Sequence, residues 1–241
     1  MRGGVRESER VNPAPDHQRA LTRRRALAGV AAGCLVLVLL GAGVLTGFGP
    51  QLRLDTAASH LFYVGDHPPV WLHDVLGAET APGLTVVRLI LFAPVVGWLL
   101  LRRAWWPAAW VTVALVTVGP LTTLLKDAFD RVRPQFAGGG ARLHTLSFPS
   151  GHSSGIATLV VVALVLVWPL LTRALRRLSL ALGVLAIVVV GLGRMWQGVH
   201  YLTDVLGGWA FGTAWALALA LAFDAFPGGR AALTSRRVAA A

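Results

Sequence analysis

The sequence predicts an all-α membrane protein in which six transmembrane helices form one bundle. Two observations predict this class. Hydrophobic residues make up 55% of the 241 residues and charged residues only 14%, and apolar runs recur near the ~20 residues that cross a bilayer. Because a soluble domain carries roughly 25% charged residues, the composition excludes a water-soluble globule. The single cysteine, Cys34, excludes an intramolecular disulfide.

Six apolar runs are the predicted spans, at residues 26–48, 84–101, 105–125, 154–171, 178–192 and 205–226. The first follows Arg23, Arg24 and Arg25, as the core of a signal peptide also follows basic residues. Its apolar stretch exceeds the about 7 to 15 residues of a signal core, so we expect an uncleaved span. Residues 1–25 are predicted to be a disordered tail, 26–226 the membrane domain, and 227–241 a second tail.

The basic residues predict how the bundle is oriented. Most of the 22 cations lie in the two tails and in the connections that share a face with them. An excess of Arg and Lys marks the cytoplasmic face, so both termini are expected in the cytoplasm. The net charge of +11 is then a topology signal and an attraction to anionic membrane lipids, and not a nucleic-acid surface. An aromatic belt is predicted near the same face, from Trp98, Trp105, Trp106, Trp110 and Trp168.

The outer connection after the third span carries two cations, Lys126 and Arg133. Seven residues separate them, close to two helical turns, so we expect both on one helical face, with Pro134 ending the helix. Two interfacial cations that reach toward water would show the same spacing. Lys126 is the only lysine beside 21 arginines, which favours a specific role for it.

The same connection ends in Pro149-Ser150-Gly151-His152, directly before the fourth span. Unpaired backbone N–H groups at a helix start attract anions, and a small Ser-Gly pair leaves room for one. A plain N-cap by Ser150, or by a serine just after it, would explain the serines equally well but not His152.

The outer connection after the fifth span holds Arg194, His200 and Asp204. His200 and Asp204 are four residues apart, so they are neighbours on a helical face, and a carboxylate on one ring nitrogen raises the basicity of the other. A satisfied His-Asp pair that caps the sixth span is the simpler alternative. That alternative leaves Arg194 unexplained.

Together the two connections supply three cations, two neutral donors and two histidines, one of them paired with a carboxylate. A phosphoryl group spreads its charge over three oxygens and suits several donors at once, whereas a carboxylate needs fewer. The sequence therefore predicts a phosphate site, made by Lys126, Arg133, Ser150, Gly151, His152, Arg194, His200 and Asp204.

These residues resemble the three signature motifs of the type 2 phosphatidic acid phosphatase superfamily, which also includes the vanadium haloperoxidases. The matching stretches are Lys126-x6-Arg133-Pro134, Pro149-Ser150-Gly151-His152 and Arg194-x5-His200-x3-Asp204. The third motif usually begins Ser-Arg, and here Gly193 takes the place of the serine. The six-span layout resembles the integral membrane branch, and the haloperoxidase branch is soluble.

The resemblance implies a two-step phosphoryl transfer without a metal. His200 would attack phosphorus and form a phosphohistidine, Asp204 would orient it, and His152 would protonate the leaving oxygen and then activate water. The phosphoryl oxygens would be held by Lys126, Arg133, Ser150, Gly151 and Arg194.

The remaining outer connection, residues 49–83, contains His60, Asp66, His67, His73 and Asp74, and side chains of these types can bind a metal. Two adjacent prolines and bulky aromatic residues instead favour a short segment lying on the outer leaflet.

The expected function is hydrolysis of a lipid phosphate or pyrophosphate at the extracytoplasmic face of a bacterial plasma membrane. The resemblance favours an isoprenoid pyrophosphate such as undecaprenyl pyrophosphate. The alternatives are phosphatidic acid or phosphatidylglycerophosphate as substrate and, from another class, a non-catalytic lipid-phosphate binder or transporter. His152 and His200 argue against the last, because binding needs neither an acid nor a nucleophile.

Overall fold

The computed structural model describes residues 15–65, 69–136 and 145–233, and every described element is a helix or a helical turn. The fold class predicted from the sequence is confirmed. The described residues form eight α-helices, namely α1 (Pro15–Leu45), α2 (Gly49–Phe62), α3 (Val70–Thr80), α4 (Thr85–Leu101), α5 (Trp105–Phe129), α6 (Gly151–Val167), α7 (Arg173–Trp196) and α8 (Leu202–Ala222). Short 3-10 turns occupy Ala81–Gly83 and Trp168–Leu170.

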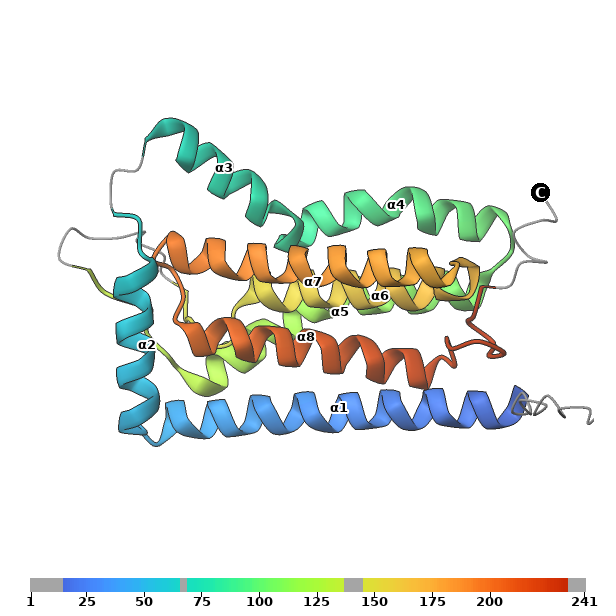
Figure 1. The fold of residues 1–241 in the computed structure, drawn as a ribbon, viewed down its shortest axis with the longest axis horizontal. Coiled ribbons are helices and arrows are strands. Elements are labelled where there is room, and N and C mark those ends of the chain that lie inside the picture. Colours follow the sequence, from blue (N-terminus) through green and yellow to red (C-terminus); the bar gives the residue numbers. More distant parts are fainter. Residues whose placement is uncertain (1–14, 66–68, 137–144, 234–241) are drawn as a thin grey trace, which may run out of the picture.

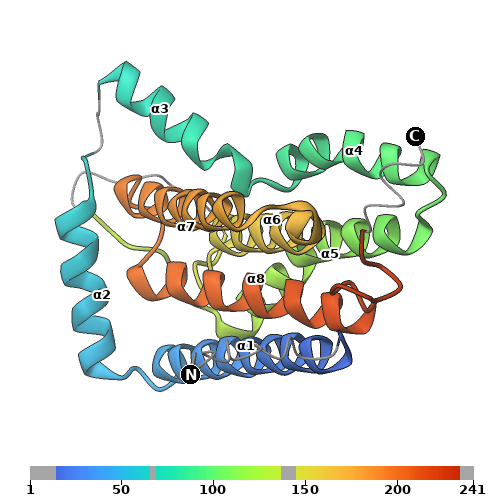
Figure 2. The same ribbon diagram turned by 45° about the vertical axis from the view of Figure 1, so that its right-hand side comes forward.

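Helices α1 and α4–α8 run along the long axis of the molecule, and α2 lies across one end of the bundle (Figure 1). Turning the molecule shows that α7 and α6 lie between α4 and α8, with α1 packed on α8 (Figure 2). In the described part of the chain, five helices are long and apolar enough to cross a membrane. The pair α3 and α4, bent by 57°, gives a sixth candidate.

Arg88, the one cation inside a predicted span, closes the bend between α3 and α4. Its side chain is only 1% exposed. One guanidinium nitrogen donates to the carbonyl of Gly83 in the 3-10 turn, and the other donates to Thr85 Oγ1 at 3.0 Å. A charge inside the bilayer is tolerated when it is buried in protein and bonded, and here it fixes the point where the chain changes direction.

The predicted disordered tail is wrong for residues 15–25, because α1 begins at Pro15; residues 1–14 lie outside the described part. A tertiary contact explains the early start. Arg19 and Arg23 lie one helical turn apart and both bind the carboxylate of Asp224, at 2.5 and 2.8 Å. The C-terminal segment also packs inward as far as it is described, since Ala231, Ala232 and Leu233 are buried.

Glycines on α8 let its backbone lie close to α6. A Cβ atom added to Gly208 would lie 2.6 Å from the carbonyl oxygen of Ser150, and one added to Gly212 would overlap the carbonyl of Ser154. Small residues permit such close approach between membrane helices. The contact brings the start of α6 level with the start of α8, where two of the three motifs lie.

Arginine and tryptophan pair at the end of the bundle where the described parts of both termini lie. The guanidinium carbons of Arg102, Arg176 and Arg230 lie 5.7, 5.2 and 4.0 Å from the ring centres of Trp98, Trp168 and Trp106. These contacts fit an interfacial belt. Trp110 does not belong to it, because this side chain is fully buried in the core.

Candidate active site

The three motifs meet at the end of the bundle that α2 covers, opposite the end that carries the described parts of both termini (Figure 1). Lys126 lies in the last turn of α5, and His152 in the first turn of α6. Arg194 is in the last turn of α7, and Asp204 in the first turn of α8. Since α5 to α8 alternate in direction, the ends that carry these residues face one another.

The predicted helix through Lys126 and Arg133 is wrong, because α5 ends at Phe129. Asp130 takes the left-handed conformation with φ 45° and ψ 38°, and its N–H bonds the carbonyl of Lys126. Aspartate tolerates this conformation, and Pro134 disfavours a helical Arg133. The two cations still converge, since both donate to the carbonyl of Leu146, Arg133 through Nη2 at 3.3 Å.

Arg133 is buried and contacts the candidate nucleophile directly. Its Nε donates to Thr145 O at 2.7 Å, and its Nη1 donates to Val199 O at 2.6 Å. The same Nη1 lies 3.2 Å from Nε2 of His200. The guanidinium is therefore held by two backbone carbonyls while it faces the imidazole.

His200 and Asp204 form the pair that the sequence predicted, although His200 precedes α8 instead of lying on it. Nδ1 of His200 is 3.3 Å from Oδ2 of Asp204, and the N–H of Tyr201 donates to that oxygen at 2.9 Å. An ionised carboxylate can only accept, so Nδ1 carries the proton of a neutral imidazole. The Nε2 lone pair then points toward Arg133 and the site.

The environment keeps His200 uncharged. Its side chain is 2% exposed. Burial lowers the pKa of His200 well below its usual value of 6.5, and the positive charges of Arg133, Arg194 and Lys126 lower it further. An unprotonated imidazole is the form that can act as a nucleophile.

Ser150 is the N-cap of α6, as the simpler interpretation of the motif expected. Its Oγ accepts from the N–H of Ser153 at 3.4 Å and from Ser153 Oγ at 3.0 Å, so its own proton is left to donate. The N–H of Ser150 donates to the carbonyl of Asp204 at 2.9 Å, which ties the second motif to the third. A Cβ added to Gly151 would meet only Thr122 Cγ2, at 3.9 Å, so protein packing does not require a glycine there.

His152, one residue after Gly151, lies against the 3-10 turn Ala81–Gly83. A Cβ atom added to Gly83 would lie 2.8 Å from Cβ of His152. Arg194 is 7% exposed and donates to Oε1 of Gln197 at 2.5 Å. Gln197 in turn donates to the carbonyl of Leu76 at 2.9 Å, which links the third motif to α3.

A cavity of about 420 Å³ reaches the site between α4, α5 and α6. Three signature residues line it, namely Lys126, Gly151 and His152. The rest of its lining is mainly small or apolar, from Gly83, Leu84, Thr85, Gly119, Pro120, Thr122 and Thr123. The cavity therefore combines a cation and a histidine of the site with residues of the membrane helices.

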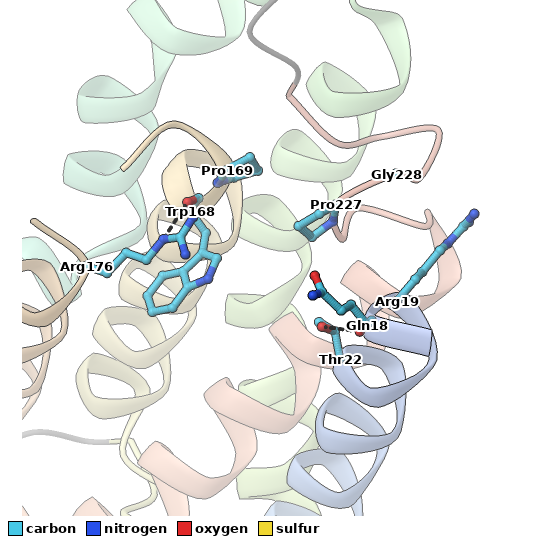
Figure 3. Close-up of a pocket in the computed structure, with 8 residues that line it drawn as sticks. All are labelled: Gln18, Arg19, Thr22, Trp168, Pro169, Arg176, Pro227 and Gly228. Atoms are coloured by element: carbon cyan, nitrogen blue, oxygen red, sulfur yellow. Dashed lines mark hydrogen bonds between the residues drawn. The ribbon is translucent and has the colours of Figure 1, made fainter. Parts of the chain in front are cut away.

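A second cavity, of about 580 Å³, lies at the other end of the bundle (Figure 3). Its lining comes from the start of α1, the turn after α6, the start of α7 and the segment after α8, and includes Arg19 and Arg176. Figure 3 shows the Arg176 guanidinium beside the Trp168 ring and the Arg19 side chain directed away from it. None of the signature residues lines this cavity, so it is separate from the candidate site.

Sequence reasoning missed two charged residues of the site, Arg131 and Asp55. The Arg131 side chain is 7% exposed, and its guanidinium binds Oδ1 of Asp204 at 2.6 Å. Its second nitrogen binds Oδ2 of Asp55, from α2, also at 2.6 Å. The position of Arg131 inside the first motif was an available signal. Nothing in the sequence around Asp55 sets it apart.

The outer connection 49–83 forms α2 and α3, and α2 crosses the end of the bundle as an interfacial segment would (Figure 1). Among the residues that the structure describes, no group of three or more His, Cys, Asp or Glu side chains could hold a metal. Asp66 and His67 lie outside those residues.

Apolar membrane helices around buried cations, a second histidine and a pair formed by a neutral histidine and a carboxylate define an integral membrane phosphatase. The chain belongs to the PAP2 superfamily, whose sequence model matches residues 90–226. The superfamily expected from the motifs is thus confirmed, and the chain is a membrane lipid phosphatase of that family.

Relatives of known activity and structure agree with this assignment. Phosphatidylglycerophosphatase B of Bacillus subtilis (strain 168) is 35% identical over 147 residues, which cover 59% of this chain and 70% of that protein. A lipid A 1-phosphatase of Rhizobium johnstonii is 32% identical over 127 residues, 49% of this chain and about half (48%) of that protein. The crystal structure of a transmembrane PAP2 type phosphatidylglycerolphosphate phosphatase from Bacillus subtilis superposes with a TM-score of 0.69 and 29% identity, over 81% of this chain and 95% of that one.

Proposed function

We propose that the protein hydrolyses the terminal phosphate of phosphatidylglycerophosphate through a phosphohistidine on His200. One observation carries the proposal. Nε2 of a buried, neutral His200 faces Arg133 at 3.2 Å, while Nδ1 of the same ring faces Asp204 at 3.3 Å. This arrangement gives a nucleophile, a group that orients it, and a cation beside the point of attack.

In the first step, Nε2 of His200 forms a bond to phosphorus as the bond from phosphorus to the lipid oxygen breaks. His152, which lines the same cavity as Lys126, donates a proton to that oxygen, so the lipid leaves as a neutral alcohol. Asp204 stabilises the positive charge that the phosphorylated imidazole ring acquires.

In the second step, His152 removes a proton from water, and the water oxygen attacks the phosphohistidine. The bond from phosphorus to Nε2 breaks, inorganic phosphate leaves, and His200 returns to its neutral form. The charge that builds on the phosphoryl oxygens is met by Lys126, Arg133 and Arg194, by the hydroxyl of Ser150 and by the N–H of Gly151.

A lipid substrate is supported by the shape of the opening. The 420 Å³ cavity is lined by Lys126 and His152 of the candidate site together with small or apolar residues of α4, α5 and α6. An acyl chain can remain among these membrane helices while its headgroup reaches His152. A soluble phosphate ester has no acyl chain that could pack against such apolar residues.

The choice among lipids follows the relatives. The curated Bacillus subtilis relative and the solved Bacillus subtilis structure are both named for phosphatidylglycerophosphate, and the chain in the structure is matched over 95% of its length. Undecaprenyl pyrophosphate, which the motif resemblance favoured, remains a competing substrate and belongs in the test.

The test is phosphate release from a lipid panel by purified protein in detergent with a metal chelator. We expect the highest kcat/KM with phosphatidylglycerophosphate, lower values with phosphatidic acid and undecaprenyl pyrophosphate, and no release by His200→Ala. A higher kcat/KM for undecaprenyl pyrophosphate would overturn the substrate. Phosphate release that requires added Mg²⁺ would overturn the metal-free mechanism, and lipid binding without any release would favour a binder.

A further inference from the structure

Helix α2 contributes a buried carboxylate to the site, although it lies outside the span 90–226 that matches the PAP2 superfamily. Asp55 is 1% exposed. Its Oδ1 accepts from the N–H of Thr203 at 2.9 Å, and its Oδ2 accepts from Oγ1 of Thr203 at 2.6 Å. The carboxylate therefore binds the first turn of α8, one residue before Asp204.

Arg131 joins this carboxylate to the catalytic one. One arm of the guanidinium binds Asp55, and the other binds both Asp204 Oδ1 at 2.6 Å and Thr203 Oγ1 at 2.9 Å. The guanidinium carbon also lies 4.1 Å from the ring centre of Tyr201. Its orientation is thus fixed by contacts on three sides, and it faces two carboxylates at once.

The two oxygens of Asp204 have different partners. Oδ1 is held by Arg131, whereas Oδ2 receives the N–H of Tyr201 and faces Nδ1 of His200. A buried carboxylate that loses its cation is strongly disfavoured, so without Arg131 it would rotate, take up a proton or draw in water. Each of these changes would disturb the oxygen that orients His200.

We propose that Arg131 is a positioning residue for the pair of His200 and Asp204, and that Asp55 of α2 holds Arg131 in place. Phosphate binding does not depend on this network, because Arg131 makes its bonds to Asp55, Thr203 and Asp204. The position of α2 across the end of the bundle is thereby coupled to the geometry of the nucleophile. The inference rests on the proposed function, because Arg131 and Asp55 position the same nucleophile, His200.

Replacing Arg131 or Asp55 should lower kcat and leave KM almost unchanged. For Arg131→Gln we expect kcat to fall about 10- to 100-fold, the loss that is typical when a residue that orients a functional side chain through hydrogen bonds is removed. For Asp55→Asn, which keeps an oxygen for the N–H of Thr203, we expect a fall of roughly 3- to 10-fold. The double variant should be no slower than about Arg131→Gln alone, because Asp55 acts through Arg131.

The measurement is steady-state phosphate release from phosphatidylglycerophosphate in detergent micelles, with each protein's thermal unfolding midpoint recorded. Asp224→Asn is the matched control, because Asp224 also binds two arginines, Arg19 and Arg23, at the other end of the bundle. Its unfolding midpoint should fall while its kcat stays at the parent value. Arg131→Lys should recover part of the kcat, and it replaces Arg131→Gln if that variant does not fold.

Two results would overturn the proposal. One is a parent kcat in folded Arg131→Gln and Asp55→Asn, and the other is losses that multiply in the double variant. When His200→Ala is inactive, either result rejects the positioning role alone. Parent-like release by His200→Ala would reject the proposed function together with it.

Discussion

His200 lies between a carboxylate and a guanidinium, and the two neighbours have opposite effects on it. Asp204 stabilises a positive imidazole ring, whereas Arg133, Arg194 and Lys126 disfavour one. Burial adds to the second effect, so the resting ring is neutral. Once a phosphoryl group arrives, its negative charge offsets the cations, and Asp204 can then stabilise the ring that forms the bond.

This balance predicts the protonation state of His200. A lowered pKa means that the imidazole stays neutral as the pH falls through 6.5, where an ordinary histidine becomes half protonated. We expect the ¹⁵N signals of His200 in histidine-labelled protein, assigned with His200→Gln, to show no titration between pH 8 and about pH 6. A midpoint at or above 6.5 would contradict the account.

The residues found from the sequence and those missed differ in a physical way. Lys126, His152 and His200 stand at fixed spacings from other polar groups in short connections, so their chemistry was visible locally. Asp55 contacts Arg131 and Thr203 only because α2 folds across the end of the bundle. A contact of this kind, between residues 76 and 148 positions apart, leaves no local pattern.

At the scale of elements, the approach of α6 and α8 positions the catalytic groups. His152 begins α6 and Asp204 begins α8, so a change in the distance between these helices moves the acid relative to the nucleophile. Gly208 and Gly212 keep that distance short, because neither has space for a Cβ atom beside the backbone of α6.

Gly212→Ala should therefore destabilise the protein and reduce its activity. Overpacking costs about 1–3 kcal/mol, and here the obstacle is the backbone carbonyl of Ser154, which cannot rotate away. Gly97→Ala on α4 is the control, since its added Cβ meets no atom within 4 Å. Thermal unfolding in detergent should show a clear fall for Gly212→Ala and none for Gly97→Ala. Equal midpoints would mean that the helix contact is looser than described.

The spans were predictable because apolar length is a strong local signal, and the errors have local causes. The arginines before residue 26 and after residue 172 are typical of the polar flank of a membrane span, so the spans were predicted to begin after them, at residues 26 and 178. The helices instead include these arginines, because α1 begins at Pro15 and α7 at Arg173. Arginine is a good helix former, and Arg19 and Arg23 gain a partner in Asp224, which no pattern within α1 indicates. The end of α5 depends on one left-handed residue, Asp130.

At the scale of the whole molecule, the site and the described parts of the termini occupy opposite ends of the bundle (Figure 1). Most arginines of the described residues, and the three Arg–Trp contacts, lie at the end with the described parts of the termini. By the distribution of positive charge, we propose that this end is cytoplasmic and that the site faces the extracytoplasmic side.

The orientation predicts which positions a membrane-impermeant maleimide can reach in intact cells. In a Cys34→Ala background, His60→Cys on α2 should react directly. Pro227→Cys, at the end with the termini, should react only after lysis. Both native side chains are exposed, so access to the reagent depends on the side of the membrane. Labelling of Pro227→Cys alone in intact cells would reverse the orientation.

Rapid quenching after mixing with substrate shows whether His200 carries the phosphoryl group. Protein mixed with phosphatidylglycerophosphate in chelator, denatured in alkali and digested should yield a peptide phosphorylated on His200. The phosphate should be lost on acid treatment, as expected for a phosphohistidine. His152→Ala should accumulate more of this species if His152 activates the hydrolytic water, and His200→Ala should form none. Rapid phosphate release with no phosphorylated His200 at any quench time, or an unchanged rate in His200→Ala, would contradict the account.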